Sequence, residues 1–138
     1  MIEEELNKNH NQQSKEPISK AVLIKRTTKF AHDCVNLAML FRKDKPGYHI
    51  QNQLIRCSTS VASNYRAANL AQSKASFVAK LSIVIEEADE SSFWLEFGQF
   101  QGVIKSDETN RLIQEANELA LIFISARKSI QTSIDKSK

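Results

Sequence analysis

The sequence has few residues that interrupt helices, with only 3 glycines and 2 prolines among 138 residues. It has no uncharged apolar run of about 18 residues, the length that a membrane-spanning helix needs, so we expect no membrane segment. The N-terminus, MIEEELNKNHNQQSKEP, has neither the basic start nor the apolar core of a secretory signal, which predicts a cytoplasmic protein. No strand-like alternation is sustained and helix formers dominate. One all-α domain is therefore expected.

Patterns for catalysis and metal binding are missing as well. The histidines are His10, His32 and His49, and none belongs to the Glu-x-x-His pairs that hold iron in ferritin-like bundles. There is no glycine-rich phosphate loop, zinc spacing or nucleophile–base pair, so we expect no enzyme activity, no metal and no cofactor. Cys34 and Cys57 fall on apolar helical stripes, and we interpret them as reduced core thiols rather than as a disulfide or metal pair.

Apolar residues recur at helical spacing in four stretches, at about 25–43, 48–72, 73–103 and 107–134. The connections between them are short, which predicts an up-down-up-down antiparallel four-helix bundle. We expect this bundle to occupy residues 18–134. A disordered polar tail is predicted at 1–17 and a frayed C-terminus at 135–138.

Polar residues mark where these helices begin and end. The predicted N-caps are Thr27 or Thr28, then Ser73, then Ser106 or Asp107. Pro46 and Gly47 are expected to lie in the connection between the first two helices. In the middle of the second helix, Asn64 either bonds to a neighbouring helix or faces solvent, and we favour a buried hydrogen bond.

The third predicted helix has two apolar sides. One side repeats at heptad spacing over 77–98 and predicts the core face. The other side carries four large aromatic residues, Phe93, Trp94, Phe97 and Phe100. This is more aromatic surface than one bundle core needs, so we interpret it as a subunit interface, with a wide core face as the alternative.

Charge is unevenly distributed along the chain. The net charge is +3, and it divides into −2 for residues 1–17, +8 for 18–74 and −3 for 75–138. This asymmetry predicts either an anionic partner or complementary contacts between subunits, and solvated helix faces are the alternative.

Basic residues gather on the first helix and at its ends, where they could follow a phosphate backbone. Lys74 and Lys80 flank a later turn. No recognition motif accompanies these residues, so binding to RNA or DNA would depend weakly on sequence. The predicted phosphate contacts are Arg26, Lys29, Arg42, Lys43 and Lys45.

The densest acidic cluster is Glu86-Glu87-Ala88-Asp89-Glu90. Glu86 and Glu90 are four residues apart, so they share a helix face and repel each other unless a cation lies between them. Arg56 and Arg66 on the preceding helix are the predicted partners in a structural ion-pair network. A contact between subunits is the alternative.

The stretch 53–97 also carries a family resemblance. Its carriers are Gln53-Leu54-x-Arg56, Ser60-Val61-x-x-Asn64, Phe77, the acidic segment 81–90 and Trp94. Together they resemble the bacterial four-helix-bundle family first noticed as proteins encoded by intervening sequences in 23S ribosomal RNA genes. The similarity covers about residues 28–132.

The resemblance implies a left-handed bundle and a ring-like homopentamer. The family is also similar to the accessory variability protein of diversity-generating retroelements, a pentameric bundle that binds nucleic acid and a reverse transcriptase. Our hypothesis is a non-enzymatic, homo-oligomeric bundle that binds nucleic acid, RNA in the first place, through a basic surface on the first two helices. The alternative is a protein-interaction scaffold, such as an accessory subunit of a reverse transcriptase, with no nucleic-acid affinity of its own.

Overall fold

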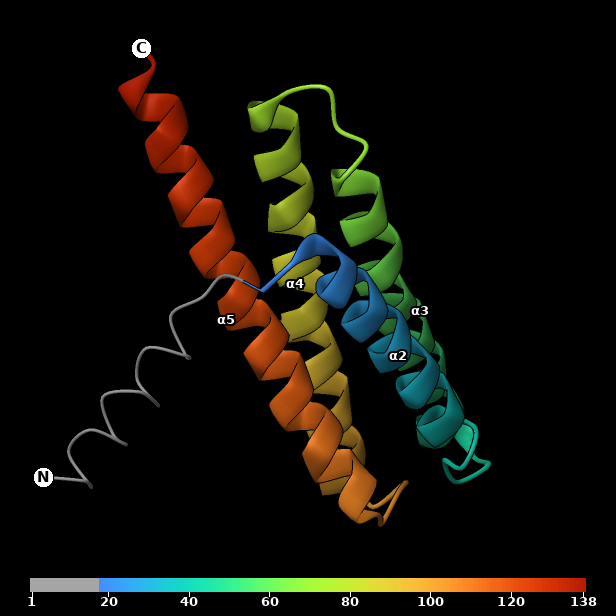
Figure 1. Cartoon of the computed structure of the whole chain (residues 1–138). Helices are drawn as coiled ribbons and strands as arrows, with labels where there is room; N and C mark the ends of the chain where they lie inside the picture. Colours follow the sequence, from blue (N-terminus) through green and yellow to red (C-terminus); the bar gives the residue numbers. More distant parts are fainter. Residues whose placement is uncertain (1–17) are drawn as a thin grey trace, which may run out of the picture.

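The computed structural model describes residues 18–138, so the tail predicted at 1–17 lies outside the described residues. Four α-helices form the described part, namely α2 (Lys20–Ala38), α3 (Lys45–Ala68), α4 (Lys74–Phe100) and α5 (Asp107–Lys136). Consecutive helices run in opposite directions, up-down-up-down (Figure 1). The predicted all-α antiparallel four-helix bundle is confirmed.

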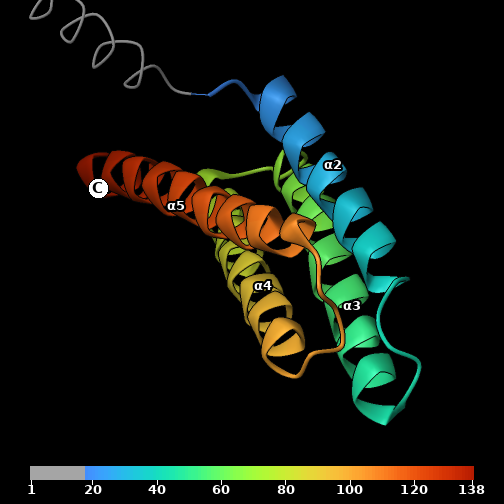
Figure 2. The same cartoon turned by 90° about the horizontal axis from the view of Figure 1, so that it is seen from below.

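Each helix packs against two neighbours, so the bundle has a square cross-section. Contacts join α2 to α3, α3 to α4, α4 to α5, and α2 to α5. Within residues 18–138, α2 and α4 make no contact and lie on opposite corners (Figure 2). No helix in this part of the chain is both long enough and apolar enough to cross a bilayer.

Serine caps start three of the helices. The hydroxyls of Ser73 and Ser106 accept backbone N–H groups at the starts of α4 and α5, which confirms both predicted positions. The cap predicted at Thr27 or Thr28 is wrong, because α2 begins earlier, after Ser19. The Thr27 hydroxyl instead donates to a carbonyl of its own helix, 2.8 Å away. Helix α5 continues to Lys136, two residues into the segment expected to fray.

Pro46 and Gly47 do not separate the first two helices as predicted, but form the first turn of α3. Asp44 caps this helix, and its Oδ1 accepts the N–H of Gly47 at 2.9 Å. Proline suits the first turn, because its missing N–H would have no partner there. Glycine is required next to it, since a Cβ at position 47 would lie 1.7 Å from the carbonyl oxygen of Arg42.

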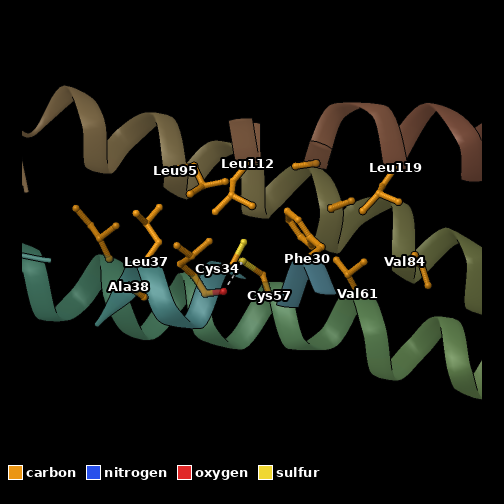
Figure 3. Packing of buried hydrophobic residues seen from close by; sticks show 14 of the residues in the cluster. Phe30, Cys34, Leu37, Ala38, Cys57, Val61, Val84, Leu95, Leu112 and Leu119 are labelled. Carbon is orange, nitrogen blue, oxygen red and sulfur yellow. Dashed lines mark hydrogen bonds between the residues drawn. The ribbon is translucent and has the colours of Figure 1, made fainter. Parts of the chain in front are cut away.

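The core runs along the axis between the four helices (Figure 3). Leu54, Leu81 and Leu112 are among its fully buried side chains. Cys34 and Cys57 are buried in it as free thiols, which confirms their predicted role. Burial raises the pKa of the Cys57 thiol to about 11 and raises the pKa of Cys34 as well, so both thiols stay protonated.

Asn64 behaves in neither of the two ways expected of it. Its side-chain amide donates to the Ser60 hydroxyl at 2.8 Å and to the Ser60 carbonyl at 3.0 Å. Both acceptors are one turn earlier in α3. A local bond therefore satisfies this half-buried amide without a neighbouring helix.

Candidate nucleic-acid and subunit interfaces

The aromatic residues of α4 form an exposed surface, which we call the aromatic face (Phe93, Trp94, Phe97 and Phe100). The exposed fractions are 51% for Phe93, 38% for Phe97 and 88% for Phe100. Phe93 stacks on Phe97 with ring centroids 5.7 Å apart, and Trp94 meets both rings edge-on. The three phenylalanines are not enclosed by the chain's own core, whereas Trp94 is half-buried and packs against it, so a wide core face accounts for Trp94 alone.

Carboxylates surround the aromatic face. Glu86, Asp89, Glu90 and Glu96 lie within two turns of Phe93 along α4. Of these, only Glu90 has a cationic partner among residues 18–138. The result is an apolar patch with an acidic border.

The acidic cluster is held by one arginine. Arg56 of α3 bonds to Glu87 at 3.2 Å and to Glu90. The hydrogen bond from Arg56 lowers the pKa of Glu90, whereas burial raises the pKa of Glu87 against the pull of the same arginine. The carboxylates at positions 87 and 90 form the network, because they face α3.

The ion pairs predicted for Arg66 and Glu86 are wrong. Neither residue forms a salt bridge within the described range. Glu86 points to the outer side of α4, since it lies half a helical turn from the buried Val84 and Ala88. Arg66 lines a groove on the α2 side of α3 and so does not reach α4.

Two of the five predicted phosphate contacts, Arg26 and Lys29, form ion pairs with carboxylates of α5 and α2. Arg26 reaches across to α5, where it bonds to Glu115, and lies 3.4 Å from Glu118. Lys29 pairs with an aspartate one turn later in α2, at 2.6 Å. Arg26, half-buried between two helices, is therefore better described as a structural ion-pair residue.

The remaining three, Arg42, Lys43 and Lys45, lie at one end of the bundle, which we call the capped end (loops 39–44 and 101–106 with the first turn of α3; Figure 1). The loops are joined by a hydrogen bond of 2.8 Å from the N–H of Arg42 to the carbonyl of Val103. The Arg42 side chain pairs with Asp44. Lys43 and Lys45 form no salt bridge in the part of the chain that the structure describes.

A second group of cations lies at the opposite end, where the α3–α4 connection meets the C-terminal part of α5 (Figure 1). We call this surface the basic end. It comprises Lys74, Lys80, Arg127, Lys128 and Lys136. None of these five has a carboxylate partner in residues 18–138.

Hydroxyl groups take the place of carboxylates at the basic end. Lys74 donates to the Ser133 hydroxyl at 2.8 Å, and Arg127 donates to the Ser82 hydroxyl at 3.2 Å. Sequence reasoning noted Lys74 and Lys80 but did not connect them with Arg127, Lys128 and Lys136, because α5 is distant from them in the chain. A usable signal was present, since residues 45–85 and 119–134 contain no aspartate or glutamate.

A shallow groove runs between α2 and α3 on the outer side of the bundle. Small side chains form much of it, including Ala31, Ala62 and Ser63. We call it the α2–α3 groove, and its lining is Thr28, Ala31, His32, Val35, Thr59, Ala62, Ser63 and Arg66. No group of three or more potential metal ligands occurs here or elsewhere between residues 18 and 138.

Two comparisons with known proteins found matches to this chain. Residues 19–125 match the family model described as 23S rRNA-intervening sequence protein. The chain is similar to a crystal structure from Bacteroides thetaiotaomicron, a protein of unknown function from the S23 ribosomal protein family. The two share 29% identity over 80% of this chain and 99% of the other, with a TM-score of 0.73. No curated protein matches the chain.

Proposed function

Since the chain belongs to the 23S rRNA-intervening sequence protein family, we propose that it is a non-enzymatic, homo-oligomeric bundle that binds nucleic acid, with RNA as the main ligand. The observation that carries this proposal is the basic end. Its five cations come from α4 and α5, and none is paired with a carboxylate in residues 18–138. They are therefore available to an external polyanion.

The chemistry of the basic end suits a phosphate backbone. Lysine and arginine neutralise phosphate charge, and serine and threonine hydroxyls donate to phosphate oxygens. On α5, the Ser129 hydroxyl lies between Lys128 and Lys136 on one exposed strip. Contacts of this kind hold any sequence, so we expect affinity to depend strongly on salt and weakly on base sequence.

The test compares two triple variants that remove the same charge from opposite ends. The first is Lys74→Gln, Lys128→Gln and Lys136→Gln, and the matched control is Lys43→Gln, Lys45→Gln and Lys105→Gln. Filter binding of a 20-nucleotide single-stranded RNA is measured over a salt series. Losing three phosphate contacts should reduce the slope of log affinity against log salt by about 2 in the first variant.

The control variant should retain most of the wild-type slope, because Lys43 and Lys45 form only a small second patch. Equal reductions of the slope in both variants would contradict the basic end as the binding surface. If the wild-type protein fails to bind RNA and DNA at low salt, nucleic-acid binding itself is wrong.

The aromatic face favours a second candidate function, a protein-interaction scaffold. Exposed phenylalanines at this density are typical of contact surfaces between proteins. The partner would be another copy of the chain or a larger enzyme, such as a reverse transcriptase that this protein serves as an accessory subunit. Such a scaffold would assemble and yet leave RNA unbound at every salt concentration.

Self-association is part of the proposal, and the ring of five copies implied by the family resemblance is its expected form. Light scattering should give a mass near five times the chain mass of 15.6 kDa. A monomer at micromolar concentration would remove the oligomer from the proposal and leave nucleic-acid binding to be judged by its own test.

A further inference from the structure

We propose that copies of this chain associate head to tail, with the aromatic face of one copy seated in the α2–α3 groove of the next. The inference rests on the self-association proposed above. It adds the identity of the two surfaces that meet.

The shapes of the two surfaces fit each other. Phe93 and Phe97 project from α4, whereas the groove is lined mainly by alanine, serine and threonine side chains. Small residues allow a neighbouring element to approach closely, and an aromatic ring filling such a depression is the usual anchor of a protein interface. Val35 adds apolar surface to the groove for a ring to contact.

The charges of the two surfaces are also complementary. The aromatic face is bordered by Glu86, Asp89 and Glu96, which have no cationic partner in the described chain. The groove contains Arg66, which has no carboxylate partner there either, and α3 contains no aspartate or glutamate. Lys25 lies one turn before Thr28 on the same side of α2, where it extends the positive border.

These surfaces cannot meet within one copy of the chain. Helix α4 lies diagonally opposite α2 (Figure 2), and the groove is lined by residues of α2 and α3 alone. A contact that joins two different surfaces is heterologous, so it repeats until it closes a ring or extends as a filament.

The alternative is a two-fold contact between the aromatic faces of two copies. That arrangement would bring the carboxylate borders of both copies together. Like charges placed opposite one another weaken an interface, so the head-to-tail contact is favoured.

The experiment uses two full-length variants, each with one damaged surface. Phe93→Ser with Phe97→Ser removes the aromatic anchors, and Ala62→Trp fills the groove. Leu121→Ser is the control, because Leu121 is a comparably exposed apolar residue (66%) on α5, outside both surfaces. Circular dichroism checks that each variant folds, and Arg66→Glu replaces Ala62→Trp if the tryptophan prevents folding.

Light scattering should find each damaged variant to be monomeric and the control to be assembled like the wild type. An equimolar mixture of the two damaged variants should give dimers that grow no further, because one intact aromatic face meets one intact groove. A mixture that stays monomeric overturns the inference, as does a groove variant that assembles fully. A monomeric wild type would instead contradict the proposed self-association.

Discussion

The two ends of the bundle carry similar numbers of basic side chains but use them differently. At the capped end, the Arg42 guanidinium pairs with Asp44 and donates to the Gly102 carbonyl at 3.4 Å. At the basic end, Lys74 and Arg127 donate to serine hydroxyls and have no carboxylate partner in residues 18–138. The comparison shows that the number of cations in a region does not determine how many are available to a ligand. That number depends on whether the fold brings carboxylates beside the cations.

The ends differ in their backbone as well. Two glycines fix the backbone at the capped end: position 47, in the first turn of α3, has no space for a Cβ beside the Arg42 carbonyl, and Gly102 has a φ of 71°, which other residues rarely adopt. At the basic end, α3 and α4 are joined by a connection without glycine. We infer that the capped end contributes more to stability, and the basic end more to binding.

The largest effect is expected from Gly47→Ala. Its Cβ would overlap the Arg42 carbonyl oxygen, so the backbone must shift, and we expect the free energy of unfolding to fall by about 3 kcal/mol. Urea denaturation measures the change. Gly102→Ala is the comparison: no atom lies within 4 Å of its Cβ, so only the left-handed conformation costs energy, about 1 kcal/mol. Equal losses of stability in the two variants would contradict the close approach of the Arg42 carbonyl oxygen to position 47.

The next largest effect is expected from a substitution that adds a carboxylate to the basic end. Thr132→Glu places an acid four residues from both Lys128 and Lys136. We expect RNA affinity at low salt to fall by about tenfold, since two cations lose their availability to phosphate. Thr132→Gln is the matched control without the charge. Unchanged affinity for the glutamate variant would argue against this strip of α5 as a binding surface.

A smaller effect, of opposite sign, is expected from Thr109→Val. The Thr109 hydroxyl is buried near the capped end and has no hydrogen-bond partner among residues 18–138. Valine has a similar shape and no unsatisfied polar group, so stability should rise by about 1 kcal/mol. Thermal unfolding of the two proteins measures the gain. Loss of stability would mean that the hydroxyl has a partner, such as a bound water.

The smallest effect is a dependence of the capped end on pH. The Gly47 N–H, and then Arg42, lower the pKa of Asp44 in the folded state. The stabilisation from a lowered carboxylate pKa is complete above the unfolded pKa and is lost as the pH falls through the folded pKa. The difference in melting temperature between wild type and Asp44→Asn should therefore shrink as the solution is acidified below the usual aspartate range. A constant difference would contradict this role of Asp44.

Much of the fold could be predicted from the sequence, because helical periodicity and serine caps are local signals. Apolar stripes located all four helices, and Ser73 and Ser106 marked two starts correctly. Pro46 and Gly47 were wrongly assigned to a connection between helices, because proline and glycine can either end a helix or lie in its first turn. The choice depended on Asp44, whose capping role the sequence reading did not include.

The candidate surfaces were harder to predict, because they depend on contacts between distant segments. Arg26 looked available until the fold placed Glu115, 89 positions later, beside it. Whether Glu86 or Glu87 pairs with Arg56 depends on how α4 is rotated relative to α3. The spacing of residues along one helix does not determine that rotation. The aromatic face was found because its excess of large rings is visible in a single segment.

The position of Trp94 gives the molecule a built-in optical reporter. It is the only tryptophan, and it lies within the aromatic face with the His49 ring 5.4 Å away and the Phe93 ring 4.9 Å away. Burying that face against another copy would exclude water from the indole ring and shift its fluorescence emission to shorter wavelengths. The unlabelled protein would then report its own assembly state as it is diluted.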